Sequence, residues 1–258
     1  MDLFSQSSEV QNGLRLLAIN VQSPPKERAL GLAKEISALN PNIIVLYELS
    51  NADGSQMLLD DLYRYARYDI FWERPEKNGY AVAVCIKGLQ ALKFPIAEKE
   101  NVTRIQVLQV GIAAQDIYLV GVYVPALNHA NIFKRSSFFS NLRSELTKLK
   151  NTNGGRIILV GDVNAISPRH IPPIYAFAQE GYPLETIITD LDLTDLFQTR
   201  PQKQEYTWFS PDGSVRQLLD NCFISSTLDS QIKKCEVLHS FRTGKYSDHS
   251  AILVEGFD

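Results

Sequence analysis

The sequence predicts an α/β (α+β) fold built as a four-layer sandwich, with two packed mixed β-sheets flanked by helices. Short β-type runs follow one another with only a few helical stretches between them, which favours two sheets packed face to face with the helices outside. The 258 residues are 45% hydrophobic, which is ample for a sizeable core. No repeat, low-complexity tract or linker divides the chain, so we expect a flexible tail at 1–12 and a single domain over 13–258.

In the first half of the chain, strands alternate with two helices. An amphipathic helix is predicted over 25–39, because apolar residues at near-helical spacing share one face and Pro41 marks its end. A turn at 50–54 leads into a second helix that reaches about Tyr65. The strands expected here are 14–19, 42–47, 68–72, 80–86, 103–110 and 117–124. Alternation of apolar and polar residues over 104–110 predicts that this strand is half exposed.

The second half begins with the longest predicted helix, 131–150, which Asn153-Gly154-Gly155 ends. A β-branched strand follows at 156–160, and the region 171–198 is expected to form helix, loop and helix. The remaining strands are expected at 206–209, 218–225, 232–238 and 245–254.

Polar residues follow several of the buried strands at the point where each strand ends. Gly161 permits a tight turn after the strand 156–160 and delivers an acid and an amide together. One such ending is unremarkable, but several, each carrying a metal-ligand or acid/base residue type, indicate one cleft at the strand ends. These strand-end residues are Asn20, Glu48, Asp162, Asn164, Asp248 and His249.

The charge balance excludes a general polyanion-binding protein. The formal net charge is −3, whereas sequence-independent nucleic-acid affinity comes from many Lys and Arg contacts to phosphate. An enzyme that grips a few phosphates locally remains compatible with this charge. No apolar run approaches the roughly 18 residues of a membrane span, so no membrane partner is expected.

The N-terminus and the cysteines bear on location. Residues 1–9 have neither a basic start nor an apolar block, so they do not form a secretory signal. The cysteines Cys85, Cys222 and Cys235 lack zinc-site spacing, and their odd number argues against a disulfide framework. We therefore expect an intracellular protein, in cytoplasm or nucleus, that is not secreted.

Several short motifs occur in a fixed order between about Leu14 and Glu255. They are Ile19-Asn20-Val21, Leu46-Tyr47-Glu48, Tyr123-Val124-Pro125, Gly161-Asp162-Val163-Asn164, Thr207-Trp208, Asp220 and Ser247-Asp248-His249. In this order they resemble the endonuclease/exonuclease/phosphatase superfamily, which has the DNase-I-like fold. The Tyr-X-Pro element resembles the branch that holds AP endonucleases and LINE retrotransposon endonucleases.

The chain departs from the pattern of that family at four positions. Many members carry Gln at the position of Tyr47, Arg at that of Leu218 and Asn or a similar polar residue at that of Ala126. Gln22 stands where AP endonucleases usually carry an acidic or small residue.

The resemblance implies a catalytic set at the strand ends. Asp220 is the implied partner that orients the ring of His249, which can accept a proton near neutral pH. Asp162 is expected to activate the attacking water or to protonate the leaving group, and Asn164 to bind the phosphate or fix that water. Tyr123 is expected to donate to a non-bridging oxygen. Which of Asp162 and His249 handles the nucleophile stays open.

The implied cofactor is Mg²⁺, with Mn²⁺ as a substitute. Glu48 is the principal expected ligand, because Mg²⁺ is typically bound by one or two protein carboxylates with water and substrate phosphate. Asn20 is expected to hold the metal or its waters, and Asp248 to supply a second carboxylate or brace His249. The alternatives are that Asn20 caps a strand turn and that Glu48 is an ordinary surface acid.

Four residues are candidates for substrate binding. Trp208 offers an aromatic face for base stacking next to Thr207, Arg135 could reach a phosphate from the long helix, and Asn128 follows the Tyr-X-Pro turn. A tryptophan in a strand is at least as often part of the core, and arginines on helices usually face water.

Together these features predict a monomeric, Mg²⁺-dependent phosphodiesterase that acts on DNA. By the resemblance, it nicks duplex DNA and leaves a 3′-hydroxyl and a 5′-phosphate. One alternative keeps the fold and changes the substrate to RNA or another phosphate ester. Another is a non-catalytic module that binds nucleic acid.

Overall fold

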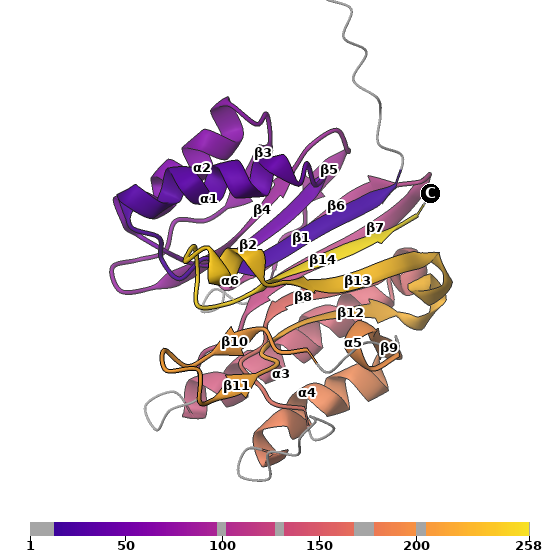
Figure 1. Cartoon of the computed structure of the whole chain (residues 1–258). Helices are drawn as coiled ribbons and strands as arrows, with labels where there is room; N and C mark the ends of the chain where they lie inside the picture. The colour runs from indigo at the N-terminus through magenta and orange to yellow at the C-terminus, as the bar shows by residue number, and fades with distance from the viewer. Residues whose placement is uncertain (1–12, 97–101, 127–131, 168–177, 200–204, 258) are drawn as a thin grey trace, which may run out of the picture.

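Two six-stranded sheets pack face to face and carry helices on their outer faces (Figure 1). The computed structural model describes residues 13–96, 102–126, 132–167, 178–199 and 205–257. The predicted four-layer sandwich is confirmed. The predicted tail at 1–12 lies outside the described residues.

The first sheet has the strand order β13-β14-β1-β2-β4-β3, in which β1 and β2 are parallel and the other pairs are antiparallel. Its strands are β1 (Leu14–Asn20), β2 (Ile43–Ser50), β3 (Asp69–Trp72), β4 (Tyr80–Ile86), β13 (Ile232–Leu238) and β14 (Ala251–Gly256).

The second sheet has the order β5-β6-β7-β8-β12-β9, with β7 and β8 parallel. Its strands are β5 (Ala91–Lys93), β6 (Ile105–Ile112), β7 (Gln115–Tyr123), β8 (Ile157–Asp162), β9 (Leu193–Asp195) and β12 (Asp220–Ser225). A separate two-stranded hairpin is formed by β10 (Trp208–Phe209) and β11 (Arg216–Gln217).

The helices cover the two outer faces. Apolar residues of α1 and α2 pack on the first sheet, and those of α3 and α4 pack on the second. The helices are α1 (Lys26–Ala38), α2 (Asp53–Arg64), α3 (Ile132–Lys150), α4 (Ala178–Asp190), α5 (Leu196–Thr199) and α6 (Ser240–Thr243), with 3-10 helices η3 (Asn153–Gly155) and η5 (Ser226–Gln231). No described helix combines the length and the apolar character that a membrane crossing requires.

The core between the sheets is built from alternate residues of each strand. Leu16 and Ala18 of β1 face Ile158 and Val160 of β8 across it, because side chains at i and i+2 share one face of a strand. The alternation continues to the ends of the strands, where the inward-facing residues are polar. Polar side chains therefore lie at one end of the apolar core between the sheets.

Three expectations about elements are wrong. The strand expected at 245–254 begins only at Ala251, because α6 and the turn after it occupy residues 240–245. Residues 104–110 do not form a half-exposed strand, because Ile105 and Val107 pack against the α3 side while Leu108 and Val110 pack between the sheets. The region after α4 also contains the short strand β9 before α5, where only helix and loop were expected. The segments β5, β11 and α6 have at most four residues each and carry too little periodicity to be predicted.

Candidate active site

Inner-facing positions at the ends of five strands form the site. In the second sheet Tyr123 is paired with Asp162 across β7 and β8, and Asp162 with Asp220 across β8 and β12. In the first sheet Asn20 is paired with Tyr47. Paired residues on neighbouring strands project to the same face. The register alone therefore gathers these side chains at one end of the core.

The turn after β8 fixes the carboxylate of Asp162. Gly161 has φ +153°, and a Cβ there would lie 1.9 Å from the carbonyl oxygen of Val122, so only glycine lets β8 run this close to β7. Asn164, with φ +43°, donates its backbone N–H to Oδ1 of Asp162 at 2.9 Å. Its side-chain Nδ2 donates to the carbonyl of Val124 at 2.9 Å. Asn164 thus ties Asp162 to the end of β7.

Glu48 owes its direction to an irregularity in β2. The pairing of β2 with β4 shifts between Leu46 and Leu49, and Glu48 has φ +61°. A bulge of this kind re-aims a side chain, and a left-handed backbone in a residue other than glycine is often found at functional sites. Oε2 of Glu48 accepts a hydrogen bond from Asn20.

Asn20 joins the two sheets at the site. Its Nδ2 donates to Oε2 of Glu48 at 2.8 Å and to Oδ2 of Asp162 at 3.0 Å. Its Oδ1 accepts from the backbone N–H of Gln22 at 2.9 Å. The amide therefore holds two carboxylates from different sheets beside each other, in addition to ending β1.

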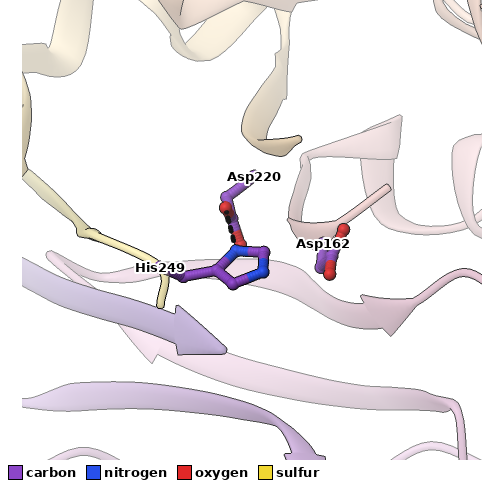
Figure 2. A group of neighbouring side chains, drawn as sticks. All are labelled: Asp162, Asp220 and His249. Carbon is purple, nitrogen blue, oxygen red and sulfur yellow. Dashed lines mark hydrogen bonds and ion pairs between the residues drawn. The ribbon is translucent and has the colours of Figure 1, made fainter. Parts of the chain in front are cut away.

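Asp220 and His249 form a buried pair. Nδ1 of His249 lies 2.7 Å from Oδ2 of Asp220, and Figure 2 shows the second ring nitrogen turned towards Asp162. Ligand atoms of Asp162, Asp220 and His249 all lie within 4.8 Å of one another. The structure thus brings together the acid, the imidazole and its partner as the sequence predicted.

Burial and charge shift the pKa values of this cluster. Burial, followed by the charge of Asp220, raises the pKa of Asp162 well above its usual range, against the opposing effects of His249 and of hydrogen bonds from Asn164 and Asn20. Burial alone would lower the pKa of His249, but the charge and hydrogen bond of Asp220, with the charges of Asp162 and Asp248, raise it to about 9. His249 is therefore protonated at neutral pH, while Asp162 is a carboxylate of unusual basicity.

Thr207 accepts hydrogen bonds from backbone N–H groups at Asp220 and next to His249. Its Oγ1 accepts the backbone N–H groups of Leu219 at 3.1 Å and Asp220 at 3.0 Å, and its carbonyl accepts the N–H of Ser250 at 2.7 Å. Thr207 is fully buried, so in this structure it braces the pair and does not face a substrate.

Ser247 links His249 to β1. Its hydroxyl donates to the backbone carbonyl of Asn20 at 2.7 Å and accepts the backbone N–H of His249 at 3.0 Å. Ser247 therefore fixes the backbone of His249 relative to the end of β1.

Asp248 and Trp208 form the outer side of the site. The indole Nε1 of Trp208 donates to Oδ2 of Asp248 at 3.1 Å, and Oδ1 of Asp248 lies 4.0 Å from Nε2 of His249. Both side chains are partly exposed. The indole therefore fixes a carboxylate at the rim.

Tyr123 lies between this cluster and a cation that the sequence did not reveal. The guanidinium of Arg104 is 4.8 Å from the Tyr123 ring centroid and donates from Nη1 to the Tyr123 carbonyl at 3.2 Å. Burial and then the charges of Glu48 and Asp162 raise the pKa of Tyr123, so the phenol stays protonated. The only signal for Arg104 in the sequence is its place at the start of an alternating strand.

Arg28 is a second cation that sequence reasoning missed. From the first turn of α1 its guanidinium donates to the carbonyls of Val21 at 3.0 Å and Gln22 at 2.7 Å, where the backbone of Gln22 is left-handed with φ +49°. Burial lowers the pKa of the Arg28 guanidinium. The charges of Asp248 and Glu48 act in the opposite direction and raise it. Arg28 thus fixes the loop after β1 at the acidic rim.

One candidate for substrate binding, Arg135, is buried in the described structure. Arg135 is 5% exposed, donates from Nη1 to the carbonyl of Pro125 at 2.8 Å and packs on the ring of Phe139. It therefore anchors the segment after β7 and does not face water. Asn128 lies outside the described residues.

The donor set fits a divalent cation such as Mg²⁺. Glu48 and Asp248 are partly exposed carboxylates at the rim, and Oδ1 of Asp248 is a buried oxygen that has no hydrogen-bond partner among the described residues. Asp220 and His249 use their facing atoms on each other. Glu48, which Asn20 holds in place, and Asp248 are of the ligand type that a hard cation prefers. The ligand atoms that lie close enough together to share one ion are those of Asp162, Asp220 and His249.

A cavity of about 270 Å³ lies elsewhere, beside β5 and β6. It is lined by residues such as Phe94, Ile96 and Gln106 and includes none of the residues of the cluster.

Comparisons with known proteins agree with this arrangement. The Endonuclease/Exonuclease/phosphatase family matches residues 17–249, which include Asn20, Asp162 and His249.

Solved structures with the same fold come from several kinds of protein. The endonuclease domain of TRAS1, a telomere-specific non-LTR retrotransposon, is 18% identical with a TM-score of 0.70, and covers 95% of this chain and 98% of that one. The 3′ phosphatase NExo from Neisseria, bound to product DNA hairpin, is 22% identical with a TM-score of 0.74 over 95% and 99%. The AP endonuclease LMAP from Leishmania major is 18% identical with a TM-score of 0.76 over 95% and 88%.

Proposed function

Because the chain belongs to the endonuclease/exonuclease/phosphatase family and is a hydrolase, we propose that it is a Mg²⁺-dependent phosphodiesterase that nicks duplex DNA. The products would be a 3′-hydroxyl and a 5′-phosphate. The observation that carries the proposal is a buried carboxylate of raised pKa, Asp162, lying beside an imidazole that its own partner, Asp220, keeps protonated.

Asp162 is the proposed general base. A base works best when its pKa lies near the working pH, and burial next to Asp220 moves the pKa of Asp162 in that direction. The hydrogen bonds from Asn20 and Asn164 hold the carboxylate in one orientation. Asp162 is therefore suited to take the proton of an attacking water.

His249 is the proposed cation for the phosphate. With a pKa of about 9 it is a poor base at neutral pH but a good partner for a non-bridging phosphoryl oxygen. We therefore propose that Asp162, and not His249, handles the nucleophile. Tyr123, which stays protonated, would donate to the same phosphoryl group from the β7 side.

In the proposed reaction, water oxygen bonds to phosphorus while Asp162 accepts a water proton, and the bond from phosphorus to the 3′-oxygen breaks. The leaving oxygen takes a proton from solvent water and becomes the 3′-hydroxyl, and the new P–O bond remains in the 5′-phosphate. A bound Mg²⁺ would neutralise charge on the phosphoryl and leaving oxygens. Glu48 and Asp248 are the residues proposed to hold it, with Mn²⁺ as a substitute.

Two considerations support DNA as the substrate. Two of the similar structures are endonucleases and the third was bound to a DNA hairpin. Arg104 and Arg28 add positive charge at an otherwise acidic rim, where a backbone phosphate needs it. We also propose that a monomer is active.

A supercoiled-plasmid assay tests the proposal. We expect nicked circles with Mg²⁺ or Mn²⁺, none with EDTA, and losses of at least about 10²-fold for Glu48→Gln and His249→Ala. Glu73→Gln, on an exposed carboxylate paired with Lys93, is the matched control and should nick normally. Normal nicking by both site variants would contradict the proposal.

The same samples should be tested against other phosphate esters. A panel of RNA, abasic duplex and a DNA end with a 3′-phosphate separates the substrate classes. Cleavage of another ester but not of intact DNA would keep the chemistry and change the substrate. DNA binding without turnover of any ester would favour a non-catalytic module.

A further inference from the structure

Tyr47 is a buried tyrosine at the floor of the candidate active site. It is the inner-facing residue of β2 that pairs with Asn20, and its side chain is fully buried between the sheets. Among the described residues, its hydroxyl has no partner in regular hydrogen-bond geometry. A buried hydroxyl without a partner is costly, so a nearby acceptor is expected.

Asp220 has one carboxylate oxygen without a hydrogen-bond donor in regular geometry among the described residues. Its Oδ2 is taken by Nδ1 of His249 at 2.7 Å, but Oδ1 is buried and has no regular partner within the described part of the chain. A carboxylate oxygen can only accept, and a phenol can donate. One unused donor and one unused acceptor therefore remain at the same end of the core.

The two groups lie at the same end of the core between the sheets. Tyr47 is paired with Asn20, whose Nδ2 is 3.0 Å from Oδ2 of Asp162, and Asp162 is paired with Asp220 on the neighbouring strand. Asp162, the other nearby acid, already accepts from Asn20 and Asn164 with its two oxygens. Oδ1 of Asp220 is therefore the acceptor that is left.

We propose that Tyr47 is a positioning residue whose hydroxyl donates to Oδ1 of Asp220, so that Tyr47 and His249 hold the two oxygens of one carboxylate. Asp220 of the second sheet would then be held from the first sheet by Tyr47 of β2 and by His249, which immediately precedes β14. This fixes the plane of the carboxylate and, through it, the direction of Nε2 of His249. The catalytic consequence rests on the proposed function, but the hydrogen bond does not.

The test compares Tyr47→Phe with Tyr68→Phe. Tyr68 is an equally buried tyrosine whose hydroxyl donates to the Pro41 carbonyl at 2.6 Å, on the helix-covered face of the first sheet. Both changes delete one buried hydroxyl, so a purely structural role predicts equal effects. We expect kcat to fall roughly tenfold in Tyr47→Phe with KM within about twofold, and to stay at the wild-type level in Tyr68→Phe.

A spectroscopic measurement is independent of turnover. The His249 Nδ1–H proton, assigned by its loss in His249→Ala, should move downfield in Tyr47→Phe, because Asp220 without its second donor accepts more strongly from the ring. It should not move in Tyr68→Phe. An unchanged signal in Tyr47→Phe would overturn the proposal, whereas absence of any DNA cleavage by wild type would overturn only the proposed function.

Wild-type protein provides the remaining check if Tyr47→Phe does not fold. The Tyr47 hydroxyl proton should exchange slowly with solvent and show a nuclear Overhauser effect to the β-protons of Asp220. A slowly exchanging hydroxyl without that contact would overturn the assignment.

Discussion

Asp162 and Asp220 occupy directly paired positions on the antiparallel strands β8 and β12, and both are buried, at 1% and 0% exposure. Like charges placed opposite each other on neighbouring strands are destabilising, and more so away from water. His249 relieves part of this repulsion by pairing with Asp220. The fold therefore holds two acids together at a cost in stability, which is typical of a functional site.

Asp162→Asn should separate stability from activity. The raised pKa of Asp162 means that the ionised form is disfavoured in the folded state, so this group lowers the free energy of unfolding as pH rises through that pKa. In EDTA, the asparagine variant should gain roughly 0.5–2 kcal/mol over wild type at pH 8, and less at pH 5. Denaturant titrations at the two pH values measure this difference.

The same variant should lose at least about 10²-fold in nicking rate, since it cannot accept a proton. Asp69→Asn, which neutralises an exposed carboxylate on β3, should change neither quantity. A destabilised Asp162→Asn protein at pH 8 would show that the carboxylate is structurally required.

The rate should depend on pH in a bell shape. Asp162 must be ionised to accept a proton, and its pKa is raised by burial and by Asp220, so activity should increase as pH rises through neutrality. His249 must be protonated, so activity should fall above its pKa of about 9. Asp220→Asn removes the charge that raises the pKa of His249 and should move the alkaline limb to lower pH. A limb that stays in place would contradict the assigned roles.

Tyr123→Phe should lower kcat by roughly 10²-fold with little effect on folding, because it removes a preorganised donor and keeps the ring that packs on Arg104. Tyr80, whose ring meets that of Tyr123 edge-on at 5.7 Å, supplies the control. Steady-state kinetics should show that Tyr80→Phe keeps most of the activity. Equal losses in both variants would contradict a specific role for the Tyr123 hydroxyl.

Thr207→Val should damage the Asp220–His249 pair at a distance. It leaves the backbone N–H groups of Leu219 and Asp220 without their shared acceptor, at a cost of roughly 1–3 kcal/mol in the free energy of unfolding. Thr207→Ser keeps the hydroxyl and should remain close to wild type in stability and rate. Urea titration distinguishes the two variants. An unaffected valine variant would show that the Thr207 hydroxyl does not stabilise the site.

The strand ends were predictable because the alternation of side chains along a strand is a local property. An apolar run that alternates towards the core must place its next inner residue at the edge of that core, which is how Asn20, Asp162 and the Asp248–His249 pair stand out. Partners set by long-range packing were not predictable. The pairing of Trp208 with Asp248 joins residues 40 positions apart, and the burial of Arg135 depends on Pro125 and Phe139 together.

Two further features depend on geometry that single residues do not reveal. The bulge at Glu48 appears only when β2 is paired with β4. Arg104 gains its place at the site from the way Tyr80 and Tyr123 enclose its guanidinium.

The most direct test of the central claim is cleavage of a defined DNA duplex in water enriched in ¹⁸O, followed by mass spectrometry of the fragments. If a water activated at Asp162 attacks phosphorus, single turnover should place one ¹⁸O in the new 5′-phosphate and leave an unlabelled 3′-hydroxyl. Label in a 3′-phosphate, or a labelled 5′-phosphate formed at the wild-type rate by Asp162→Asn, would contradict the account.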